Sequence, residues 1–110
     1  MVKQGDIIKL NFDPQSRWEQ AGYRPAVVVS NDTFNIRTNM VIVCLITNTK
    51  RSFPLHIPLD GRTKTTGYVL CEHIKSLDLS MRECRVVARI PDDLLDRVIA
   101  TVFSEMDKPK

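Results

Sequence analysis

Two short runs of apolar, largely β-branched residues constrain the fold of this chain more than any other feature. Residues 26–30 read Ala-Val-Val-Val-Ser, and residues 40–46 read Met-Val-Ile-Val-Cys-Leu-Ile. Neither run alternates with polar residues, which is typical of strands buried on both faces. We therefore predict two central strands. The chain lacks the crossover helices that a parallel α/β sheet would need, so the sheet is expected to be mostly antiparallel.

Weaker strand signals surround these two runs. In residues 6–12, Ile8, Leu10 and Phe12 alternate with polar positions, which predicts a strand with one solvated face. Residues 55–59 lie among prolines and are placed at a sheet edge. Further strands are predicted at 67–71 and 85–90, and 72–78 fits either a strand ending or a short helical turn. Polar loops are expected at 15–22, 31–39 and 47–52.

The periodicity changes after residue 90. Pro91 suits the first position of a helix, and Asp92 and Asp93 suit its positive N-terminal end. Apolar residues then recur on one helical face: Leu94, Leu95, Val98, Ile99, Val102, Phe103 and Met106. The pattern predicts a mainly β domain over residues 1–110, a small barrel of five to seven mostly antiparallel strands with a C-terminal helix.

Composition excludes several classes of protein. The 16 Lys and Arg against 13 Asp and Glu give a net charge of +3, too small by itself to indicate nucleic-acid binding. No segment approaches the roughly 20 apolar residues that span a bilayer, and no signal peptide is recognisable, so a cytoplasmic location is expected. The three cysteines lack CxxC spacing and are expected to be reduced. Cys71 and His73 lack further ligands at suitable spacing, so no metal site is predicted.

The polar loops carry groups suited to RNA chemistry. Arg24 directly precedes a buried strand, and its planar guanidinium matches phosphate oxygens, although the residues alone favour a salt bridge to Glu19 or Asp32. Thr47 ends a strand, where its hydroxyl could contact a phosphate or only bond its own turn. His56, among prolines and apolar residues, is interpreted as structural.

Read in order, these segments resemble the MazF/PemK family of toxin endoribonucleases, over roughly residues 4 to 103. The most specific segment is the Glu-Gln-x-Gly-x-Arg-Pro run at residues 19–25, which follows the first strand. The other matching segments are Gly5-Asp6, Asn11-Phe12-Asp13-Pro14, Ala26-Val27-Val28 with Ser30, Ile46-Thr47, Phe53-Pro54 and Ile74-Lys75-Ser76-Leu77-Asp78.

The resemblance implies an SH3-like barrel that forms a homodimer, cleaves single-stranded mRNA without a metal or other cofactor, and is blocked by a cognate antitoxin. It assigns catalysis to Arg24 and Thr47. An Arg/Asp pair used by some relatives is only half kept here, because Glu72 replaces the acid and Leu70 occupies the place of the arginine. His73 departs from the relatives in a region that resembles a base-reading surface.

Cleavage without a metal would use the ribose 2′-OH as nucleophile and leave a 2′,3′-cyclic phosphate and a 5′-OH. Glu19 and Glu72 are candidates for proton transfer. Contacts to RNA are expected from these residues: Trp18, Gln20, Asn48, Lys50, Arg51, His73, Lys75 and Ser76. The alternative is a non-enzymatic module on the same barrel, either an RNA-binding domain or a toxin that poisons a topoisomerase.

Overall fold

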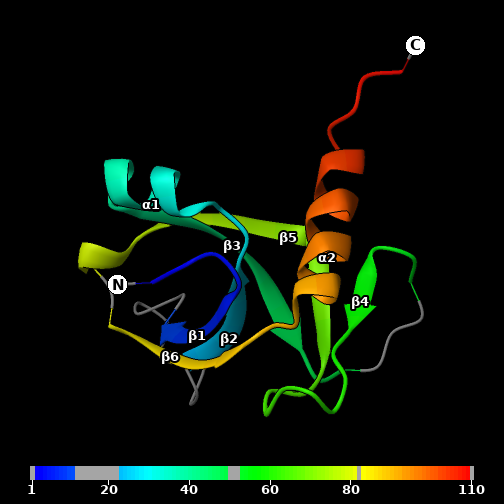
Figure 1. Ribbon diagram of the computed structural model, residues 1–110, viewed down its shortest axis with the longest axis horizontal. Helices are drawn as coiled ribbons and strands as arrows, with labels where there is room; N and C mark the ends of the chain where they lie inside the picture. The colour runs from blue at the N-terminus through cyan, green and yellow to red at the C-terminus, as the bar shows by residue number, and fades with distance from the viewer. Residues whose placement is uncertain (1, 12–22, 50–52, 82, 110) are drawn as a thin grey trace.

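The computed structural model describes residues 2–11, 23–49, 53–81 and 83–109. It contains a curled β-sheet with a long helix across one side (Figure 1). The strands are β1 (Asp6–Asn11), β2 (Tyr23–Val28), β3 (Met40–Thr47), β4 (His56–Pro58), β5 (Tyr68–Asp78) and β6 (Cys84–Arg89). The helices are α1 (Asp32–Thr38), α2 (Asp92–Ser104) and the 3-10 turn η1 (Leu79–Met81).

All six strands join in one sheet with the order β4-β5-β3-β2-β1-β6, and every neighbouring pair is antiparallel. The two continuous apolar runs form β2 and β3 in the middle of this order, as predicted. The proline-flanked β4 lies at one edge, also as predicted. The mainly β fold with a C-terminal helix is therefore confirmed, and its six strands fall within the predicted range.

Each face of the sheet covers its own cluster of apolar side chains. Ile7 and Val27 pack with residues of α2, including Leu95 and Val98. Their sequence neighbours Ile8 and Val28 pack on the opposite face with Val41, Val43 and Leu77. Ile7, Ile8, Val27 and Val28 have no exposed surface. This two-sided burial explains why the central strands are continuously apolar.

The predicted loop at 31–39 is wrong, because this segment contains α1. The side chain of Asn31 accepts a hydrogen bond from the backbone N–H of Phe34 at 2.8 Å and so caps the helix N-terminus. Asn39 ends the helix in the left-handed conformation at φ 57°, which asparagine tolerates well. The helix is short, and its Asn and Thr residues have low helix propensity, so capping is its main local signal.

Two smaller differences concern β5 and α2. The strand continues from Tyr68 to Asp78, so of the two possibilities for 72–78 the strand is correct. Pro91 is the N-cap residue of α2 rather than its first helical residue. Phe103 and Met106 belong to the predicted apolar set but are 64% and 62% exposed.

The three cysteines form no disulfide. Burial raises the pKa of the Cys44 thiol and of the Cys71 thiol to about 12 in each case. Among the described residues, no helix combines the length and the apolar character needed to cross a membrane.

Candidate active site

Arg24 and Thr47 lie on neighbouring strands and share one cavity. The register of β2 and β3 pairs Ala26 with Leu45, and Arg24 and Thr47 each lie two residues beyond this pair. Both residues line a cavity of about 300 Å³, together with Thr49, His73 and apolar residues of β3 and β5. The two residues that the family resemblance assigned to catalysis are thus brought together.

The hydroxyl of Thr47 is held in a turn at the end of β3. Its Oγ1 accepts a hydrogen bond from the backbone N–H of Thr49 at 3.2 Å. The turn interaction considered from the sequence is therefore present. It uses only the acceptor side of the hydroxyl, and the O–H remains able to donate to a phosphate oxygen.

A second cavity of about 360 Å³ is lined by Pro25 and Asn48, which are the chain neighbours of Arg24 and Thr47. Lys9 and Lys64 also line it. The amide oxygen of Asn48 accepts a hydrogen bond from Thr66 Oγ1 at 3.0 Å, so this predicted RNA contact is held by the loop before β5.

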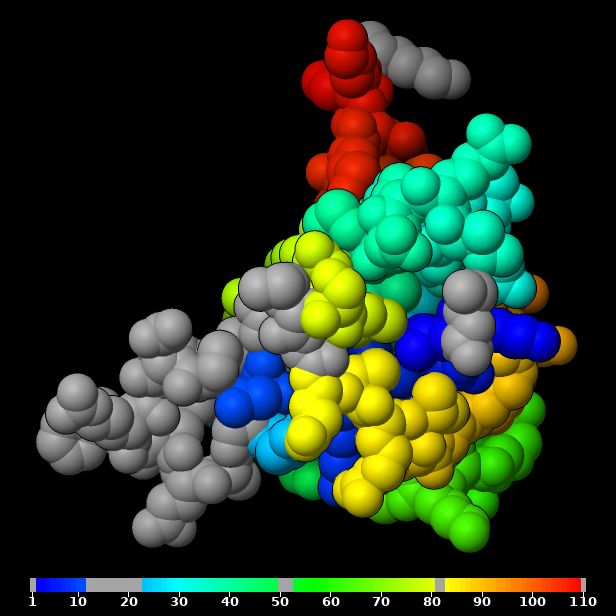
Figure 2. Space-filling model, turned by 90° about the vertical axis from the view of Figure 1, so that its left-hand side faces the viewer, coloured from blue at the N-terminus to red at the C-terminus, as the bar shows by residue number. Residues whose placement is uncertain are grey.

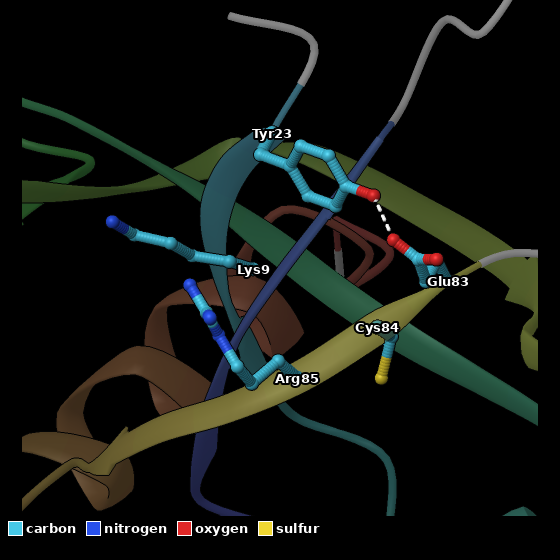
Figure 3. Close-up of a pocket in the computed structure, with 5 residues that line it drawn as sticks. All are labelled: Lys9, Tyr23, Glu83, Cys84 and Arg85. Carbon is cyan, nitrogen blue, oxygen red and sulfur yellow. Dashed lines mark hydrogen bonds between the residues drawn. The ribbon is translucent and has the colours of Figure 1, made fainter.

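A third cavity of about 520 Å³ shares Lys9 and Tyr23 with the second and adds Glu83, Cys84 and Arg85. Figure 2 shows the end of β1 and the beginnings of β2 and β6 side by side on this face. The side chains of Lys9 and Arg85 extend in the same direction, away from the hydrogen-bonded pair of Tyr23 and Glu83 (Figure 3).

The hydrogen bond from Tyr23 to Glu83 raises the pKa of the tyrosine above its ordinary value. The phenol therefore stays protonated at neutral pH and donates its hydrogen bond to the carboxylate of Glu83. We define the second and third cavities, which share Lys9 and Tyr23, as the basic groove, with Lys9, Lys64 and Arg85 as its cations. A connected row of cations suits the phosphates of a single-stranded nucleic acid.

Glu72 does not line the Arg24 cavity, and its carboxylate lies close to two histidines. Its Oε2 lies 2.7 Å from Nε2 of His56 and 3.8 Å from Nε2 of His73. Burial raises the pKa of Glu72, but the hydrogen bond from His56, its own backbone N–H and the two imidazoles outweigh this effect, so the net shift is downward. His56 is 8% exposed and has the structural role that the sequence indicated.

The remaining predicted residues are placed as follows. Lys75 and Ser76 are exposed on β5 and line none of these three cavities. The other five lie outside the described residues: Trp18, Glu19, Gln20, Lys50 and Arg51.

Sequence reasoning missed Lys9, Lys64 and Arg85. Lys9 and Arg85 are register partners on β1 and β6, so both emerge from the sheet at the same level. In the sequence, Lys9 and Arg85 each stand out only as a polar position within a strand. The strand pairing is needed to show that the two positions are adjacent.

The family model for the PemK-like, MazF-like toxin of type II toxin–antitoxin systems matches residues 3–104. The chain belongs to this family. It is 29% identical to the endoribonuclease PemK of Escherichia coli over 102 residues, which cover 89% of this chain and 77% of PemK. It is 37% identical to the endoribonuclease toxin MazF of Escherichia coli K12 over 73 residues, which cover 66% of this chain and 65% of MazF.

Solved structures of the family have the same fold. A crystal structure of MazF from Deinococcus radiodurans matches with a TM-score of 0.83 and 32% identity, covering 96% of both chains. A MazE–MazF structure from the same organism also has a TM-score of 0.83, with 28% identity and coverage of 98% and 97%. The prediction of a toxin family whose named relatives are endoribonucleases is confirmed.

Proposed function

We propose that this toxin-family protein cleaves single-stranded RNA by making the ribose 2′-OH attack the adjacent phosphorus. The observation that carries the proposal is the shared cavity of Arg24 and Thr47. Charge gathers on the non-bridging phosphate oxygens in the transition state. A guanidinium and a hydroxyl fixed on neighbouring strands supply preorganised donors for that charge.

The reaction needs no metal in this proposal. The bond from O2′ to phosphorus forms while the bond from phosphorus to O5′ breaks, and the 2′-OH proton leaves as O5′ gains one. The products are a 2′,3′-cyclic phosphate and a free 5′-OH. DNA is inert because it lacks the attacking group.

In this proposal the basic groove binds phosphates of the strand beyond the cleaved bond. Lys9, Lys64 and Arg85 would face phosphates, and Asn48 and His73 would contact bases or sugars near Arg24. Lys75 and Ser76 remain candidate contacts for a longer RNA or for the antitoxin. Trp18, Gln20, Lys50 and Arg51 keep their proposed RNA-binding roles from the sequence.

A test uses oligonucleotides in EDTA, each containing one ribose in an otherwise 2′-deoxy strand. Cleavage after the single ribose, with a cyclic phosphate end, supports the proposal. Cleavage that continues when this 2′-OH is replaced by hydrogen contradicts it. RNA that stays intact under all conditions favours the non-enzymatic alternative.

The partners proposed are a second copy of the chain and a cognate antitoxin. Phe103 and Met106 leave an apolar surface beside a cavity of about 400 Å³ between α1 and α2, which a second copy would cover. Sedimentation of the wild type and of Phe103→Glu tests this, because the charge should shift a dimer to monomers.

The relative crystallised as a MazE–MazF complex supports the antitoxin. An acidic antitoxin segment would compete with RNA for the basic groove. The arrangement is supported if a co-expressed antitoxin protects RNA from cleavage and if high salt weakens this protection.

A further inference from the structure

A bulge in β5 brings two ionisable residues to the edge of the Arg24 cavity. The register with β3 pairs Leu45 with Leu70 and then Cys44 with Ile74. Residues 71–73 therefore lie between two consecutive pairs and bend out of the ladder. Glu72 and His73 belong to this bulge, and such irregularities re-aim side chains that a regular strand would direct elsewhere.

Glu72 is held in place from β4. An ionised carboxylate can only accept hydrogen bonds, so at 2.7 Å His56 Nε2–H donates to Glu72 Oε2. The other ring nitrogen of His56, Nδ1, is buried and has no hydrogen-bond partner among the described residues. A ring with its hydrogen on Nε2 leaves no buried N–H unpaired, which favours this tautomer and this direction of the hydrogen bond.

His73 is the exposed counterpart on the other side of the same carboxylate oxygen. Its Nε2 lies 3.8 Å from Glu72 Oε2, and its side chain is 51% exposed. It lines the cavity that contains Arg24 and Thr47, whereas Glu72 does not. Of the described residues that line this cavity, His73 is the one with an imidazole, the side chain most often used for general acid–base catalysis.

We propose that His73 is the general base of the RNA cleavage and that Glu72, fixed by His56, positions it. The inference rests on the proposed function and deepens it. Nδ1 of His73 takes the proton of the 2′-OH as O2′ bonds to phosphorus. The bond from phosphorus to O5′ breaks, and its electron pair stays on O5′, which takes a proton from water. The imidazolium, stabilised by Glu72, then returns its proton to solvent.

The charged and titratable groups around His73 come from different elements and have different roles. Arg24 lines the cavity from β2, and a guanidinium suits the phosphate oxygens and is a poor base. Glu72 and His56 face His73 from β5 and β4. Burial raises the pKa of Glu105, just after α2, and the nearby carboxylate of Glu72 raises it further.

The test compares the pH dependence of kcat/KM for the wild type, His73→Gln and His73→Asn. The wild-type rate should fall on the acid side as one group becomes protonated. Both variants should lose about 100- to 10,000-fold near neutral pH, together with the acid limb of the profile. Imidazole added to His73→Gly should restore cleavage in proportion to its unprotonated concentration.

The positioning role of Glu72 has its own readout. Glu72→Gln removes the negative charge beside His73, so the acid limb should remain but move to lower pH. Arg37→Gln, on the exposed last turn of α1, is the control for protein preparation and should leave the profile unchanged. Circular dichroism and thermal unfolding should confirm that every variant is folded.

The possible outcomes separate the two proposals. If the wild type cleaves RNA and Arg24→Ala does not, but His73→Gln keeps the wild-type profile, the general base is assigned wrongly while the proposed function stands. A His73 variant that changes only the sequence of the cut site would make His73 a base reader and overturn the inference. If wild-type protein cleaves no RNA, the proposed function itself fails.

Discussion

Gly67 lies against the backbone of Thr47, and a Cβ added at Gly67 would be 2.4 Å from the Thr47 carbonyl oxygen. Gly67 also has a φ of +123°, a conformation that other residues rarely adopt. The close approach fixes the end of β3, where Thr47 and Asn48 leave the strand. The candidate site therefore depends on a glycine that contacts no RNA in the proposal.

The substitution Gly67→Ala should reduce both stability and cleavage. The strained backbone and the clash with Thr47 predict a loss of about 1–3 kcal/mol in the free energy of unfolding. Urea denaturation and cleavage of a single-ribose oligonucleotide measure the two effects. Gly61→Ala is the matched control, because no heavy atom lies within 4 Å of its added Cβ. Equal behaviour of the two variants would contradict the prediction.

Arg24→Lys should retain much of the RNA affinity but lose cleavage. Lysine keeps the positive charge and loses the planar fork that can donate two parallel hydrogen bonds to a phosphate. A loss of about 100- to 1000-fold in kcat is expected for a missing transition-state donor. The Kd is measured with a fully 2′-deoxy analogue of the substrate. A variant with wild-type kcat would show that only charge is needed at this position.

The combined substitutions Lys9→Gln and Arg85→Gln should weaken the salt dependence of RNA binding. For single strands, the slope of log K against log salt concentration changes by about 0.7 for each phosphate whose charge the protein no longer neutralises. Fluorescence anisotropy over a range of salt concentrations measures the slope. Arg62→Gln is the control, since Arg62 is paired with Asp60 and Asp93 and does not line the groove. An unchanged slope in the double variant would exclude these cations from RNA binding.

The order and type of most elements could be predicted from the sequence because they depend on local patterns. The continuous apolar runs of β2 and β3 reflect burial on both faces, and the apolar face of α2 has a clear helical period. The helix α1 was missed because its Asn and Thr residues are weak helix formers, and its capping by Asn31 and Asn39 outweighs this.

The site was less predictable because it depends on contacts between distant segments. The family resemblance named Arg24 and Thr47, but only the folded structure shows that they line the same cavity. His56 and Glu72 are joined across two strands, and the bulge that re-aims His73 has no simple sequence signature. Patterns of period two describe faces of a strand and do not reveal such pairings.

Ser30→Ala should destabilise the protein although it removes a single oxygen atom. Ser30 Oγ accepts the backbone N–H of Ile42 at 2.9 Å and donates to the side chain of buried Asn35. Without it, polar groups inside the fold have no hydrogen-bond partner, at a cost of about 1–3 kcal/mol. Urea denaturation measures this loss. Ser104→Ala removes an exposed hydroxyl that bonds Thr101 and should change stability by less than about 0.5 kcal/mol.

The pair of Glu72 and His56 should make stability depend on pH in a defined direction. The pKa of Glu72 is lowered in the folded state, so its carboxylate stabilises the fold above the ordinary glutamate pKa of about 4.3. This contribution is lost as the pH falls through the lowered folded value. The stability advantage of the wild type over Glu72→Gln should therefore shrink on acidification.

Glu105 provides a matched test with the opposite sign. Burial, aided by Glu72, raises its pKa, so the folded state binds a proton more readily than the unfolded state. Relative to Glu105→Gln, the wild type should gain stability as the pH falls through the raised folded value toward the ordinary value. Urea denaturation of the three proteins from about pH 6 to about pH 3 covers both carboxyl titrations. Parallel curves for the wild type and Glu72→Gln would mean that His56 does not hold the ionised carboxylate, and the positioning of His73 would then need another cause.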